Sequence, residues 1–120
     1  MPQHIKKPTR VQSAGNKLKI IDEFIGRVNT GTSAVSIAHM KSPLGWIEPP
    51  QSPEFDEYTL VLKGSVHVKT KEKNYKVKAG EIFLAERGTT VQYSTPEEET
   101  EYIAVCLPAF SIEKVNRRDE

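Results

Sequence analysis

The chain has 120 residues, of which 37% are hydrophobic and 28% charged, with a net charge near +1. This length suits one domain with a modest core, and the balanced charge disfavours nucleic acid and membrane surfaces as partners. No run approaches the ~18 apolar residues of a membrane span, the basic start lacks the apolar stretch of a secretory signal, and a lone cysteine suits a reducing compartment, so a cytoplasmic location is expected.

Residues 1–16 contain two prolines and a glycine among polar residues, which predicts an irregular arm. A single domain is expected over 17–110. In its first segment, apolar residues recur at helical spacing, which predicts a short helix over 21–28. A glycine in this stretch weakens the helix, and a strand ending near Ile21 is the alternative. The residues at helical spacing are Leu18, Ile21, Ile25 and Val28.

From Ser33 onward the residue pattern changes to short runs rich in β-branched and aromatic residues, separated by glycine, proline or charged turns. This pattern is typical of an antiparallel sandwich or barrel, so the fold is predicted to be all-β. A hairpin is expected near residues 72–74, and residues 111–120 are expected to form a charged tail or a lid over the barrel mouth. The predicted strands are 33–40, 58–64, 65–71, 73–79, 81–86, 90–95 and 101–107.

Two sequence motifs with characteristically spaced glycines, here called glycine frames, resemble those of a known family. The first runs from Gly45 to Gly64 with Glu57 between them, and the second begins at Gly80 and includes Gly88. These frames resemble the two motifs of the cupins, small antiparallel jelly-roll barrels that commonly pair into dimers. The resemblance therefore implies a barrel with an interior cavity and a homodimer.

The chain departs from the cupin pattern where that pattern places metal-binding histidines. Those positions hold Gln51, Pro53 and Val91, and only Glu57 matches the usual ligand set. Imidazoles are good ligands for borderline-soft metals, whereas a carboxylate and an amide are weak ones. No metal or other cofactor is therefore assigned, although a variant set that adds His39 and Glu48 to Gln51 and Glu57 stays open.

Within the cupins, the strings DEYTLVLKGSVHV, KAGEIFLAERGTTVQYSTPEE and YIAVCLPAF are similar to small single-domain proteins of the EutQ type. Histidine ligands are mostly absent from that group, and acetate-kinase chemistry is associated with some members. That activity is not transferred, because this chain has no glycine-rich phosphate loop of the Walker type.

If Glu57 points inward as its matching position implies, alternation along the strands also turns Thr59 inward, and Val91 and Tyr93 share the inner face. A carboxylate beside aliphatic side chains is desolvated, which raises its pKa and suits it to proton transfer near neutral pH, with a tyrosine to bind a developing oxyanion. Glu57 and Tyr93 are the catalytic candidates. Structural roles for both, in an ion pair and in packing, are the alternatives.

Further lining of the cavity is expected from residues beside the first motif. The predicted substrate-binding residues are His39, Glu48, Gln51, Thr59 and Val91. The sequence thus predicts a homodimeric barrel that binds a small polar molecule, with acid/base or weakly metal-assisted chemistry. The alternative is a non-catalytic sensor or accessory barrel without metal.

Overall fold

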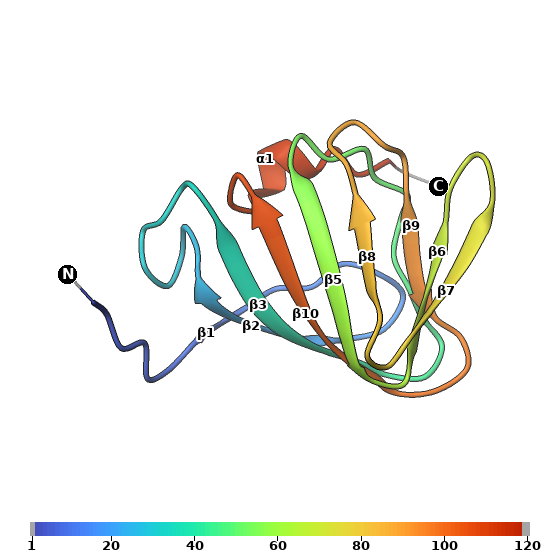
Figure 1. Ribbon diagram of the computed structural model, residues 1–120, viewed down its shortest axis with the longest axis horizontal. Helices are drawn as coiled ribbons and strands as arrows, with labels where there is room; N and C mark the ends of the chain where they lie inside the picture. The colour runs from blue at the N-terminus through green and yellow to red at the C-terminus, as the bar shows by residue number, and fades with distance from the viewer. Residues whose placement is uncertain (1, 119–120) are drawn as a thin grey trace.

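The computed structural model describes residues 2–118 and shows two antiparallel sheets (Figure 1). One sheet has the strand order β1-β2-β3-β10-β5-β8 and the other β4-β9-β6-β7. The elements are β1 Thr9–Val11, β2 Ile20–Ile25, β3 Ser36–Ser42, β4 Trp46–Ile47, β5 Asp56–Lys63, β6 Ser65–Lys69, β7 Asn74–Lys78, β8 Ile82–Ala85, β9 Gln92–Thr95, β10 Thr100–Leu107 and α1 Ile112–Val115.

The predicted all-β fold is confirmed, and each of the seven predicted strands corresponds to an observed one with ends shifted by three residues or fewer. Strands β6 and β7 form the predicted hairpin, with Lys69 opposite Asn74. Strand β10 lies between β3 and β5, so it holds the larger sheet together. Alternation along these strands places one face of each sheet in the interior.

The predicted helix over 21–28 is wrong, because residues 20–25 form β2 and pair with β3. The inner face of β2 carries Ile21 and Glu23, both buried. Glu23 Oε2 accepts hydrogen bonds from the backbone N–H groups of Val28 and Asn29, at 2.9 and 2.8 Å, and so secures the following turn. An inward glutamate breaks the apolar alternation of a strand, which is why the segment resembled a helix.

The chain ends are more ordered than the sequence predicts. Within the expected irregular arm, residues 9–11 form β1 and pair with β2. The expected charged tail contains α1, which lies beside the ends of β10 and β5 (Figure 1). Residue 1 of the arm and residues 119–120 of the tail lie outside the described residues. No helix among the described residues has the length and apolar character needed to cross a bilayer.

The core between the sheets consists of a large and a small apolar cluster. Trp46, Val61, Val66, Val68 and Tyr102 are all nearly inaccessible and belong to the large cluster. A second, smaller cluster of three buried residues lies under α1. The space between the two clusters is lined by both apolar and polar side chains, and it is the cavity described below.

We predict that Gly64→Ala destabilises the fold by at least about 2 kcal/mol, because two costs add there. Gly64 has a φ of 84°, and a Cβ would lie 2.6 Å from the backbone oxygen of Glu99 and from Thr100 Oγ1. Gly80→Ala is the matched control, since its φ of 87° is similar but a Cβ would meet nothing within 4 Å. Urea unfolding should show a loss of only about 1 kcal/mol for the control, and equal losses would contradict the predicted clash.

Candidate functional site

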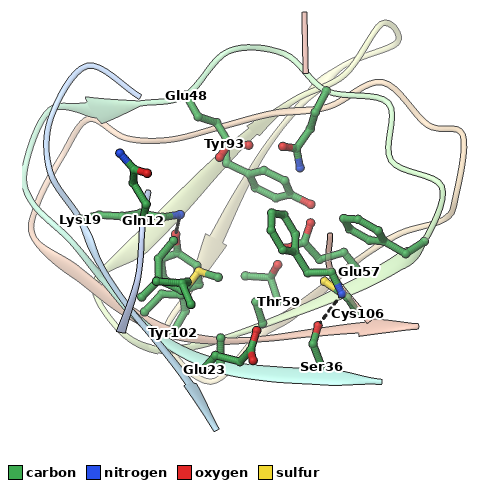
Figure 2. A pocket seen from close by; sticks show the side chains of 18 of the residues that line it. Gln12, Lys19, Glu23, Ser36, Glu48, Glu57, Thr59, Tyr93, Tyr102 and Cys106 are labelled. Carbon is green, nitrogen blue, oxygen red and sulfur yellow. Dashed lines mark hydrogen bonds between the residues drawn. The ribbon is translucent and has the colours of Figure 1, made fainter. Parts of the chain in front are cut away.

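The cavity lies between the two sheets, has polar and apolar walls, and has a volume of about 60 Å³. This is room for a few water molecules or for an organic molecule of a few heavy atoms. Its walls come from β2, β3, β5, β9 and β10, from the loop between β4 and β5, and from the C-terminal segment. Figure 2 shows Glu48, Glu57, Thr59 and Tyr93 around this space, with Glu57 and Thr59 from β5, Tyr93 from β9 and Glu48 from the loop after β4.

Strand β5 places Glu57 and Thr59 on the cavity wall. It is paired on both sides, with Cys106 of β10 and Ala85 of β8 opposite Glu57. Because side chains alternate along the strand, Glu57 and Thr59 face inward, as the sequence predicted. Tyr93 reaches the same space from β9 and is only 5% exposed.

The proline-rich loop before β5 supplies Glu48 and Gln51. The backbone N–H of Glu48 donates to the carbonyl of Tyr93 at 3.2 Å. Gln51 and Val91 exchange two backbone hydrogen bonds, both of 2.9 Å. Glu48 and Gln51 are 6% and 4% exposed and both line the cavity, as predicted.

Two of the predicted binding residues lie elsewhere. His39 is outside the cavity wall, because its neighbours Ala38 and Met40 on β3 take the inward positions, and its Nε2 lies 2.6 Å from Glu101 Oε2. The prediction that His39 lines the cavity is therefore wrong. Val91 packs in the apolar cluster and is not part of the cavity wall.

Among the buried side-chain polar atoms of the described residues, five have no hydrogen-bond partner, and all five belong to residues that line this cavity. Buried polar atoms are normally paired, since leaving one unpaired costs about 1–3 kcal/mol. Their concentration in one cavity points to a polar occupant. The atoms are Glu48 Oε2, Gln51 Oε1, Glu57 Oε1, Tyr93 OH and Arg117 Nε.

Burial shifts the ionisation of the acidic groups. Desolvation raises the pKa of Glu48 to about 7, with Lys19 and Arg117 opposing the rise and Glu57 adding to it. Desolvation also raises the pKa of Glu57. The positive charges of Lys19 and Arg117 and the neighbouring Tyr93 hydroxyl lower this pKa and so oppose the rise. Burial and the two carboxylates together raise the pKa of Tyr93 well above its usual range, so this phenol stays protonated.

The sequence analysis missed two cationic residues at the cavity. Lys19 lies directly before β2 and donates from Nζ to Tyr102 OH at 2.9 Å (Figure 2). Its Nζ also lies 4.0 Å from the centre of the Trp46 ring. Arg117 comes from the C-terminal segment and pairs through its backbone with Gln51. Neither lies in a motif or on a predicted strand, and the one signal was the basic pair at 117–118 in the expected lid.

The cavity does not fit the transition metal that the cupin pattern implies. Gln51 and Glu57 face the cavity, but Val91 at a histidine position offers no ligand atom. The variant set fails because His39 lies outside. Among the described residues no three His, Cys, Asp or Glu side chains are grouped to hold a metal ion. The oxygen donors that remain lie in a cavity shared with two cationic side chains, which disfavours a further cation.

Comparison with known proteins establishes the class. Residues 17–111 match the family of the ethanolamine utilisation protein EutQ. The chain therefore belongs to this family of small cupins.

A relative named endoribonuclease YbeY, from Myxococcus xanthus, is 41% identical over 93 residues, which are 77% of this chain and 32% of that protein. The chain thus spans about a third of that relative's length, and the activity in its name belongs to the whole relative.

Two solved structures show the same fold. A putative ethanolamine utilization protein Q from Salmonella typhimurium LT2 has a TM-score of 0.68 and 18% identity, covering 87% of this chain and 98% of that one. A predicted oxalate decarboxylase from Thermotoga maritima has a TM-score of 0.71 and 18% identity, covering 90% and 99%. At these identities the likeness concerns the fold alone.

We predict that Glu48→Gln gains stability relative to the parent protein as pH rises. The pKa of Glu48 is about 7 in the folded state against 4.5 for the ordinary group. Between these values the folded state binds more protons than the unfolded state, so the parent's free energy of unfolding falls as pH increases. The amide variant lacks this loss, and a difference of about 2.5 pKa units corresponds to about 3 kcal/mol.

Urea unfolding of both proteins from pH 5 to pH 8 measures this difference. The gap in unfolding free energy should be smallest near pH 5 and largest at pH 8. Parallel curves over the whole range would show that the Glu48 carboxyl is not desolvated in the folded state.

Proposed function

We propose that this chain binds a small polar organic molecule in the barrel cavity and that Glu57 exchanges a proton with it. The observation that carries the proposal is the convergence of five unpartnered buried polar atoms on one cavity. Without a ligand, water molecules would occupy this cavity and pair with its polar atoms. A ligand that matches these atoms would restore their hydrogen bonds and stabilise the folded state.

The two carboxyl groups suit proton transfer because burial raises the pKa of both, that of Glu48 to about 7. A base with a pKa near the working pH is abundant in its ionised form and still basic enough to accept a proton. Tyr93, which stays protonated, would donate a hydrogen bond to the substrate oxygen on which charge develops. In this scheme Glu57 takes a proton from one substrate atom and returns it to another, so the net reaction is an isomerisation.

The same cavity without chemistry is the second candidate. The cavity is small, and the C-terminal segment covers part of it. Both features favour tight enclosure of a ligand over rapid exchange of substrate and product. A binding-only barrel would retain affinity but show no turnover of the compound that it holds. The buried, free Cys106 is in keeping with the cytoplasmic location that we propose for either function.

We also propose that two copies pair through the outer face of β5 and β8. This face exposes the apolar side chains of Leu60, Leu62, Ile82 and Leu84. Leu60 lies opposite Ile82 in the strand register, so the side chains form a continuous patch. A two-fold axis through the patch would cover it with the same residues of a second copy.

We predict that Glu57→Gln weakens binding in the cavity at least tenfold, because it replaces an acceptor and proton carrier with a neutral amide. The probes are sodium glycolate, glycerol and ethanolamine hydrochloride, which offer hydroxyl groups on an anion, a neutral polyol and a cation. Calorimetric titration and thermal shift measure binding. His39→Gln on the outer face is the control and should bind like the parent protein.

Two results would remove this proposal. One is a parent protein that binds none of the three probes, and the other is a Glu57→Gln variant that binds the same probe with unchanged affinity. Proton exchange at the bound probe in deuterated buffer separates the two candidate functions, since only a barrel with acid/base chemistry would exchange a carbon-bound proton.

We predict that Leu60→Glu converts a dimer into a monomer, since it places a charge in the centre of the apolar patch. Light scattering after size exclusion should give twice the 13.5 kDa chain mass for the parent and the single mass for the variant. Leu18→Glu is the control, because Leu18 is 88% exposed and lies outside β5 and β8. A monomeric parent, or a variant that stays dimeric, would contradict the proposed interface.

A further inference from the structure

We propose that the C-terminal segment, residues 112–118, completes the ligand site and that Arg117 binds an anionic oxygen of the ligand. The inference rests on the proposed function, because it requires a ligand in the cavity. It goes further in naming a residue beyond the part of the chain that matches the EutQ family, residues 17–111. It also assigns the ligand a charge.

The segment is tied to the loop that carries Gln51. The N–H of Glu54 donates to the carbonyl of Lys114 at 2.8 Å, and the N–H of Arg118 donates to the carbonyl of Pro50 at 2.8 Å. Between these bonds, Arg117 pairs with Gln51 in an antiparallel bridge. The segment therefore runs alongside one wall of the cavity as a short backbone ladder.

Two side chains lock the segment in this position. Val115 is 2% exposed and packs with Phe55 and Cys106 in the second apolar cluster. Asn116 has a φ of 51° and turns the chain back, and its Nδ2 donates to the carbonyl of Ser52 and to Glu54 Oε2, both at 3.0 Å. Arg117 follows directly and is thereby directed toward the cavity.

The guanidinium of Arg117 lacks the anionic partner that such a position requires. Its Nε is shielded from solvent and has no hydrogen-bond partner among the described residues. Its Cζ lies 5.6 Å from the centre of the Phe110 ring, and this cation–π contact with the ring face supplies no hydrogen-bond acceptor to the buried Nε–H. No ion pair within 4.0 Å joins Arg117 to a carboxylate of residues 2–118.

The charged groups of the cavity respond to burial in different ways. Burial raises the pKa of Glu48 to about 7 and also raises that of Glu57, so burial reduces the negative charge that these two groups carry at a given pH. An arginine cannot lose its proton in a protein. Lys19 is already paired with Tyr102 OH and the Trp46 ring. Arg117 is therefore a cation at the cavity whose Nε has no hydrogen-bond partner, and which makes no ion pair, among residues 2–118.

A carboxylate or phosphate oxygen is the partner that fits this guanidinium, because its planar N–H donors bind such oxygens in pairs. The protonated carboxyl of Glu48 and the phenol of Tyr93 would donate further hydrogen bonds to the same ligand. A cavity of about 60 Å³ restricts that ligand to a few heavy atoms. Among the three probes named above, the expected ligand is the anion, glycolate.

The test compares Arg117→Gln with Arg118→Gln. Arg118 is the matched control because it is adjacent, exposed, and held mainly through its backbone, with one long side-chain bond of 3.4 Å to Ser52. NMR and calorimetric titrations with sodium glycolate should show at least tenfold weaker binding for Arg117→Gln and a change below twofold for Arg118→Gln. Arg117→Lys, which keeps the charge but not the paired donors, should recover part of the lost affinity. Inorganic phosphate and ethylene glycol serve as a second anion and a neutral analogue.

The outcomes separate this inference from the proposed function. Glycerol or ethanolamine binding in place of glycolate would support a cavity ligand but overturn the anionic assignment. Equal glycolate affinity in the parent and in Arg117→Gln would overturn the role of Arg117 alone. A parent protein that binds none of the probes would overturn both. Stronger binding of phosphate than of glycolate would keep Arg117 and assign the oxyanion to a phosphate.

Discussion

The enclosure of two carboxyl groups in one barrel is the constraint on which the rest of this structure depends. Glu48 and Glu57 enter the same cavity from a loop and from a central strand, and both are withdrawn from bulk water. Burying an ionisable group is costly unless the group is neutralised or paired. The fold tolerates this cost because β5 is hydrogen-bonded on both edges, so Glu57 cannot turn outward without breaking the register of β10 and β8.

The sequence predicted the strands well because their signal is local. Alternation of side chains needs only four to eight residues, and it correctly placed Glu57, Thr59 and Tyr93 on the cavity wall. The glycine frames also indicated the turns, as at Gly64, where positive φ and close contact with Glu99 make any other residue destabilising. Fold class and the centre of the candidate site were therefore accessible from pattern and backbone requirements.

The features that the sequence did not predict depend on contacts between segments that are distant along the chain. The inward Glu23 on β2 is paired with backbone N–H groups of the next turn, a pairing that spacing does not reveal, and it made a strand resemble a helix. His39 was expected at the cavity because it lies beside the first motif, but alternation along β3 turns Ser36 and Ala38 inward and His39 outward. Lys19 and Arg117 reach the site from outside the motifs. The alternation of side chains along a strand does not predict where the C-terminal segment will pack.

The backbone bridge between Gln51 and Val91 explains how the site changed while the barrel stayed the same. Both residues stand at positions that the cupin pattern gives to metal-binding histidines, and their backbones still exchange two hydrogen bonds. The bridge involves no side-chain atom, so a glutamine and a valine preserve this backbone pairing as well as two histidines would. Without those imidazoles, positive charge at the cavity comes from Lys19 and Arg117 instead of from a bound metal ion. A fixed metal polarises a substrate at one point, whereas the proposed contact with Arg117 would use directional N–H donors, so this arrangement favours selection of the ligand by charge and shape.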